Sequence, residues 1–200
     1  MISAIRTLIA VLLCLLTQTV SADRMQLDIN YLLTRFDAGG NDEFSSNKAI
    51  ALRHNYFFKD WLATDLGLLA TDQAYDETRQ DVVGYYRAAL QSQALMLGMK
   101  LRHRAESPYE AYGRLGLQYW RTELEVEEYF NESIPGGSTT VDDSGYGYYF
   151  AIGGAHYITD RLTIQLEYLH MMQLDLFEDS SSQPFDLGIN ALSVGLGYQF

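Results

Sequence analysis

The sequence predicts an all-β protein, an eight-stranded antiparallel up-and-down transmembrane β-barrel that follows an N-terminal signal peptide. Three observations lead to this fold class. The chain begins with a leader of the secretory type, eight later segments alternate between apolar and polar residues, and the connections between them are alternately short and long. Alternation with period two indicates strands that have one apolar face. Short turns at one end and long loops at the other are typical of membrane-spanning barrels.

The composition excludes several other classes. The 200 residues are 48% hydrophobic and 13% aromatic, which is too apolar for a disordered chain. A net charge of −12 argues against a nucleic-acid partner. The single cysteine, Cys14, excludes a disulfide framework and a cysteine-based zinc site. The only long apolar run is N-terminal, so a bundle of membrane helices is excluded as well.

The leader is predicted to be a cleaved signal peptide over residues 1–22. Arg6 supplies the positive charge, an apolar stretch follows, and Val20-Ser21-Ala22 has the small residues of a cleavage site. The apolar stretch is shorter than the roughly 20 residues that a membrane helix needs. The domain organisation is therefore a signal peptide over 1–22 and a single barrel domain over 23–200.

The first four strands are expected over 25–36, 48–58, 62–70 and 88–102. In the first, the apolar face consists of Met25, Leu27, Ile29, Tyr31 and Leu33, opposite Gln26, Asp28, Asn30 and Thr34. In the third, the apolar face consists of Leu62, Leu66 and Leu68, opposite Ala63, Asp65 and Gly67. The second and fourth alternate less regularly, with the same period.

The last four strands are expected over 111–120, 146–158, 162–174 and 191–200. The clearest apolar faces are those of Leu115, Leu117 and Tyr119, of Leu162, Ile164, Leu166 and Tyr168, and of Leu192, Val194, Leu196, Tyr198 and Phe200. Every segment contains the roughly 9–11 residues that a tilted strand needs to cross a membrane.

The connections are short over 59–61, 103–108 and 159–160, and long over 37–47, 72–87, 123–145 and 175–186. An even number of strands places both termini at the end of the barrel that carries the short turns.

The face that points outward distinguishes a membrane barrel from a soluble, ligand-enclosing barrel, which has the same period. A soluble barrel needs a charged outer face. The polar face here is mostly small or neutral, as in Asn30, Ala51, Gly67, Gly116 and Ser193, which suits a narrow interior. Aromatic residues lie near the strand ends on the apolar face, as an interfacial girdle requires: Tyr31, Tyr56, Phe58, Trp61, Tyr119, Tyr148, Tyr168 and Tyr198. This pattern favours the membrane barrel.

The C-terminal segment, Gly195-Leu196-Gly197-Tyr198-Gln199-Phe200, resembles the last strand of bacterial outer-membrane proteins. The turns at 58–62 and 157–162 are similar to periplasmic turns of the OmpA/OmpX-type eight-stranded superfamily. The resemblance implies a multi-pass protein of the outer membrane with periplasmic N- and C-termini, in contact with outer-membrane lipids and lipopolysaccharide. It also implies that Leu196, Tyr198 and Phe200 form an assembly signal for the barrel-assembly machinery, with periplasmic chaperones as partners during biogenesis.

The polar face carries equal numbers of opposite charges: Asp28, Asp65 and Glu167 against Arg53, Lys100 and Arg114. Unpaired charges in a narrow interior are costly, so the balance predicts a paired structural network. The alternative is a narrow channel that these residues line.

The four long connections contain 18 of the 26 acidic residues. Together with the tyrosines of 72–87 and 123–145, they are candidates for contact with lipopolysaccharide, through divalent cations, or with a surface partner. The alternative is a solvated acidic rim.

No histidine on an expected strand has a serine two positions away on the same face, as His54, His156 and His170 illustrate. We therefore predict no catalytic residues, no metal site and no cofactor. The predicted function is a structural or surface-interaction role, with a narrow channel as the alternative and a lipid-modifying enzyme as the third choice.

Overall fold

The computed structural model describes residues 24–37, 43–75, 79–80, 84–104, 108–130, 134–177 and 185–200. The predicted signal peptide, residues 1–22, lies outside these residues. No helix in the described part of the chain is long and apolar enough to span a membrane.

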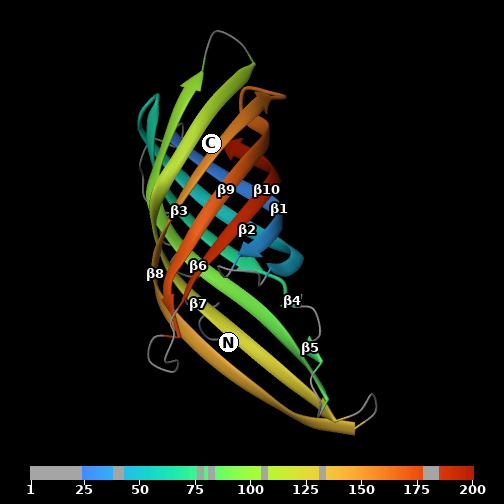
Figure 1. Cartoon of the computed structure of the whole chain (residues 1–200). Helices are drawn as coiled ribbons and strands as arrows, with labels where there is room; N and C mark the ends of the chain where they lie inside the picture. The colour runs from blue at the N-terminus through green and yellow to red at the C-terminus, as the bar shows by residue number, and fades with distance from the viewer. Residues whose placement is uncertain are drawn as a thin grey trace.

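Eight long antiparallel strands close into a ring (Figure 1). They are β1 (Met25–Asp37), β2 (Glu43–Lys59), β3 (Leu62–Thr71), β6 (Tyr85–Arg104), β7 (Tyr109–Phe130), β8 (Ile134–Tyr157), β9 (Leu162–Leu176) and β10 (Phe185–Gln199). Neighbours in the chain pair with each other, β1 pairs with β10, and β3 pairs with β6. Because the ring is closed, every strand is paired on both sides at the middle of the barrel, as a lipid environment requires. The predicted eight-stranded antiparallel barrel is confirmed.

Two short strands, β4 (Ala74–Tyr75) and β5 (Arg79–Gln80), lie within the connection between β3 and β6. Both pair with β6 at its long-loop end, at Leu90 and Ala89 for β4 and at Tyr86 and Tyr85 for β5.

The three longest described strands extend beyond the ranges that their apolar alternation predicted. β6, β7 and β8 have 20, 22 and 24 residues, whereas β1 has 13 and β3 has 10. The segment 123–145, expected to be a loop, is mostly a β-ladder that continues to the pair Phe130–Ile134. The ladder continues because Leu124, Val126, Thr139, Thr140 and Val141 favour strands, although acidic residues alternate with them. The three strands project as a sheet beyond the barrel (Figure 1).

The two faces of the barrel wall separate as the alternation predicted. On β9, Leu166 is 55% exposed and faces outward, whereas its neighbour Gln165 is 1% exposed and faces the interior. The predicted girdle residues all lie on the outward face, exposed or, for Tyr56, half-buried. Asp175 and Phe177 have φ of 56° and 60°, a conformation in which the chain leaves the ladder at the end of β9.

Candidate functional site

The centre of the barrel interior is organised around Arg114 of β7, which is 2% exposed. Its Nη2 lies 2.7 Å from Asp28 Oδ2, its Nη1 2.7 Å from Asp65 Oδ1, and its Nε 2.8 Å from Glu167 Oε2. The three carboxylates come from β1, β3 and β9. One guanidinium therefore joins four strands through charge-assisted hydrogen bonds.

Arg53 of β2 completes this central cluster. Its Nη1 lies 2.7 Å from Asp65 Oδ2, and its Nη2 lies 3.7 Å from Glu167 Oε1. The Tyr149 hydroxyl donates to Asp65 Oδ2 at 2.9 Å, and the Arg53 guanidinium lies 5.3 Å from the centre of the Tyr149 ring. The cluster links five of the eight ring strands before Tyr149 adds β8 as a sixth.

Neutral amides satisfy the remaining acceptor sites of Asp28. Gln26 and Gln165 donate to Oδ1, each at 2.7 Å, and Asn55 donates to Oδ2 at 2.8 Å. A glycine makes room for these contacts, because a Cβ at Gly197 would lie 2.4 Å from Gln165 Nε2 and 2.5 Å from Asp28 Oδ1. A buried carboxylate with this many donors is compensated without water.

Lys100, the sixth predicted network residue, lies in a second cluster nearer the short turns. Its Nζ is 3.5 Å from Glu110 Oε1, while Arg102 Nη1 is 3.5 Å from Glu110 Oε2. The Tyr157 hydroxyl donates to Glu110 Oε2 at 2.7 Å. Glu110 was not predicted as an interior residue, because the expected strand began at residue 111. The signal was present, since Glu110 has the same parity as Arg114.

All six predicted network residues are thus buried in the interior, and five of them are brought together in the central cluster. The partners of each charge, however, are set by strand stagger and were not predicted.

The half of the interior toward the long loops is apolar, which was not expected from a small or neutral polar face. Large side chains at inward positions form one core cluster, among them Leu32, Phe36, Leu69, Met96, Trp120, Leu169, Met171 and Ile189. A hydrogen-bonded trio is buried near them, in which Thr122 Oγ1 donates to Gln173 Oε1 at 2.8 Å and Gln173 Nε2 donates to Ser92 Oγ at 2.6 Å. The interior is therefore charged in one half and largely apolar in the other.

The projecting sheet carries a group of closely spaced acidic residues. Glu123, Glu125 and Glu127 follow each other on one face of β7, and Asp142 is paired with Glu123 on β8. Arg121 Nη2 binds Asp142 Oδ2 at 2.8 Å, and Arg87 is paired with Glu127. Within the described chain, no group of three or more His, Cys, Asp or Glu residues is placed to hold a metal ion.

The two edges of the projecting sheet differ. The β6 edge is covered by β4 and β5. On the other side, β9 pairs with β8 only from Gly147 to Tyr157. No described segment pairs with that edge of β8 between Ile134 and Tyr146.

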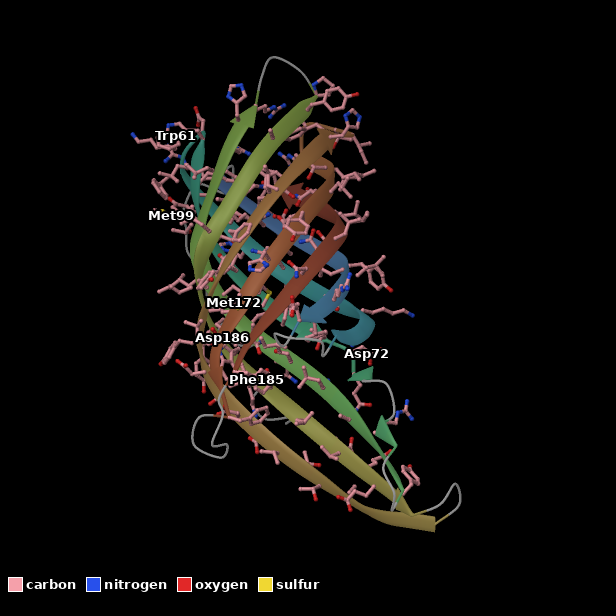
Figure 2. The ribbon with its side chains drawn as sticks, viewed as in Figure 1. Trp61, Asp72, Met99, Met172, Phe185 and Asp186 are labelled. Atoms are coloured by element: carbon pink, nitrogen blue, oxygen red, sulfur yellow. The ribbon has the colours of Figure 1, made fainter. Side chains whose placement is uncertain are left out.

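The predicted C-terminal signal residues Leu196, Tyr198 and Phe200 are exposed on the outer wall. The Tyr198 and Phe200 rings pack edge to face with centres 5.1 Å apart, and the Phe200 backbone N–H donates to Met25 O at 3.0 Å. Figure 2 shows Trp61 at the short-turn end of the barrel and Asp72 and Asp186 toward the other end.

Among the described residues, no hydrogen bond or ring contact joins a histidine to a serine. His170 shares a hydrogen bond of 2.8 Å with Asn190, and His156 packs against Tyr109 with ring centres 4.9 Å apart. Both lie on the outward face, as their parity predicted.

A family model and several solved structures match this architecture. The model of the outer membrane protein beta-barrel domain matches residues 7–200. A search of the curated proteins finds no significant match.

Solved structures share the fold at low sequence identity. Neisserial surface protein A has a TM-score of 0.62 at 10% identity, covering 90% of this chain and 98% of its own. The attachment invasion locus protein Ail of Yersinia pestis has a TM-score of 0.56 at 15% identity, covering 88% and 97%. The outer membrane protease OmpT of Escherichia coli has a TM-score of 0.51 at 12% identity, covering 92% and 99%.

Proposed function

The chain belongs to the outer-membrane β-barrel family, and on that premise we propose that it is a bacterial outer-membrane protein with a surface-interaction role. The short turns and both termini face the periplasm, and the sheet formed by β6, β7 and β8 extends from the cell surface. The observation that carries the proposal is this extension, because a barrel that only crossed the membrane would not need strands of 20 to 24 residues.

The chemistry of the extension defines the partner that fits it. Glu123, Glu125, Glu127 and Asp142 give one face a strongly negative potential, with Arg87 and Arg121 as its nearby cations. The β8 edge presents backbone N–H and C=O groups to which an extended segment can add as another strand. A basic, extended segment of a partner protein satisfies both features.

Contact with lipopolysaccharide through divalent cations is the second candidate, supported by the same carboxylates. Ail has been crystallised with a heparin analogue, sucrose octasulfate. That ligand is polyanionic, and the negative face of the extension argues against the same ligand here.

The channel alternative is disfavoured because the interior contains buried ion pairs in one half and an apolar cluster in the other. Among the described residues, His170 bonds to Asn190 and His156 packs against Tyr109, which supports a role without catalysis. The protease among the similar structures shares the fold alone.

A trimmed barrel tests the proposal. Leu124 and Val141 are directly paired, so residues 125–140 can be replaced by an Asn-Gly turn that preserves the register. The trimmed protein and a Glu123→Gln/Glu125→Gln/Glu127→Gln variant are compared with wild type for binding of fluorescent oligolysine and of lipopolysaccharide vesicles with calcium or EDTA.

We expect wild type to bind oligolysine, the charge variant to bind it weakly, and the trimmed barrel not to bind it. Calcium-dependent vesicle binding that is lost in the same variants would favour lipopolysaccharide instead. Equal binding of both probes by wild type and trimmed barrel would overturn the interaction role of the extension.

A further inference from the structure

The outer wall of the barrel has a groove of about 450 Å³ near the short turns, over the start of β7. Ala111 and Gly113 form its floor, and Leu101 of β6 and Ile152 of β8, both in register with Gly113, form its sides. Trp61, in the turn between β2 and β3, also lines it.

The groove exists because the outward side chains of β7 are small at this end. A Cβ at Gly113 would meet Ala151 O at 3.7 Å, an ordinary van der Waals contact, so a side chain can be added there without a clash. Two residues farther along, Leu115 restores the bulk of the apolar belt. The volume is within the range of about 300–1,000 Å³ of small-molecule sites, and the lining is mainly apolar.

Basic residues lie at the short-turn end of this groove. Arg102, His103 and Arg104 follow Leu101 at the end of β6, and both Arg102 and His103 line the groove. Among the described residues of the short turns and termini, the exposed cations are Arg24, Lys59, Arg104 and Arg161, whereas the exposed acids are Asp60 and Asp160. Glu110 lies 3.5 Å from both Lys100 Nζ and Arg102 Nη1, so one carboxylate is shared by two cations and this group keeps a net positive charge.

We propose that this groove is a phospholipid site. One acyl chain of an anionic glycerophospholipid from the leaflet at the short turns lies along Ala111 and Gly113. The phosphate of this lipid lies at the level of His103 and the Trp61 indole N–H, in the positive field of Arg102 and Arg104. The complementarity is between an apolar depression with a basic end and a lipid with an apolar chain and an anionic head.

Arg102 contributes its charge rather than a bidentate hydrogen bond to the phosphate. Its Nε already donates to Asp60 O at 2.6 Å, and its guanidinium lies 3.7 Å from the centre of the Phe57 ring. Arg104 is exposed, with its guanidinium 3.9 Å from the centre of the Tyr157 ring. His103 is exposed on the outward face of β6 and lines the groove.

The site lies at the opposite end of the barrel from the proposed interaction surface. Its test is therefore independent of the trimmed-barrel experiment, and either proposal can fail alone.

Native mass spectrometry of the full barrel, released from nanodiscs of equal phosphatidylglycerol and phosphatidylcholine content, tests the proposal. We expect retained phosphatidylglycerol to exceed phosphatidylcholine by about two- to fivefold, the range expected for exposed charge pairs. Gly113→Leu fills the groove and should abolish retention of both lipids. His103→Gln/Arg104→Gln should keep retention and lose the preference.

Matched controls are Ala70→Leu, which places the same leucine side chain at an exposed outward site on β3, and Arg161→Gln, which removes an exposed cation from another turn. Heat-modifiable migration in gels verifies that each variant is folded. Equal retention by wild type and folded Gly113→Leu, or no headgroup preference in wild type, would overturn the proposal. Loss of retention in Ala70→Leu as well would do the same, because it would show that retention does not depend on the groove.

Discussion

Arg114 illustrates how one residue determines the stability of the interior. Its guanidinium is buried and binds Asp28, Asp65 and Glu167 at 2.7–2.8 Å. Removing one partner of a buried ion pair leaves the others uncompensated and costs about 3–5 kcal/mol. We expect Arg114→Met to lower the free energy of unfolding by about that amount, measured by urea titration of the barrel in lipid vesicles.

An exposed ion pair serves as the control. Arg121 and Asp142 form a bond of similar length, 2.8 Å, but their side chains are 64% and 58% exposed. Such pairs contribute at most about 1 kcal/mol. Arg121→Met should therefore change the free energy of unfolding little, and a cost as large as that of Arg114→Met would refute the role assigned to burial.

At the residue scale, the position of a residue in the alternation predicted which face of the strand it occupies. It placed Asp28, Arg53, Asp65, Lys100, Arg114 and Glu167 on one face, and the structure buries all of them. It did not predict that Lys100 pairs with Glu110, because partners depend on the stagger between strands. It also did not predict that Leu169 and Met171 point inward, although their parity is that of Glu167, because large apolar residues were attributed to the lipid face.

At the scale of one strand, the cost of a cation on the outer wall should depend on its depth in the membrane, and β9 provides the test. Leu166 is exposed on the outer wall within the run from Ile164 to Tyr168. We expect Leu166→Arg to cost about 2–4 kcal/mol, as cations do on the lipid face near the midplane. The measurement is the free energy of unfolding in vesicles.

Tyr146 provides the comparison, because it is also exposed but lies where β8 continues beyond its pairing with β9. Tyr146→Arg should cost about 0–1 kcal/mol, as at an interface. Equal costs for both substitutions would contradict the assignment of the membrane boundary.

The last strand allows recognition to be separated from folding. Phe200→Ala removes the ring that packs on Tyr198 but keeps the backbone N–H that donates to Met25 O. We expect less barrel in the outer membrane of expressing cells, because the ring is part of the predicted assembly signal. The measurement is the amount of heat-modifiable protein in outer-membrane fractions.

Refolding of the same variant into detergent should resemble that of wild type, since the strand keeps its ladder. Val194→Ala, another truncation on the outer face of β10, is the control and should reach the membrane normally. Normal outer-membrane levels of Phe200→Ala would show that the ring is not recognised.

Strand existence was predictable where one face contacts lipid, and strand length was not. In β7 the alternation of large apolar residues ends near Tyr119, yet the ladder continues to Phe130. Beyond the lipid belt no apolar face is required, so Glu123 and Glu125 alternate with Leu124 and Val126 instead. A sheet exposed to water on its outer face satisfies this pattern.

At the scale of the whole molecule, the interior combines two different obstacles to ions. The half near the short turns contains the buried charge clusters, and the half near the long loops contains the apolar cluster around Trp120 and Met171. An unpaired charge draws in water because its desolvation is costly, whereas an apolar constriction stays dry. Opening either half alone should therefore leave the other half closed.

This arrangement predicts a non-additive effect on conductance in planar bilayers. Wild type, Arg114→Ala, and Trp120→Ala/Met171→Ala should all be nearly silent, while the combined triple variant should give discrete current. Each protein must first show heat-modifiable migration, so that a silent trace reports a folded barrel. Steady current through wild type would favour a channel, and current through Arg114→Ala alone would show that the apolar half does not block ions. If the triple variant is folded and silent, the two clusters contribute to stability and do not form the barrier proposed here.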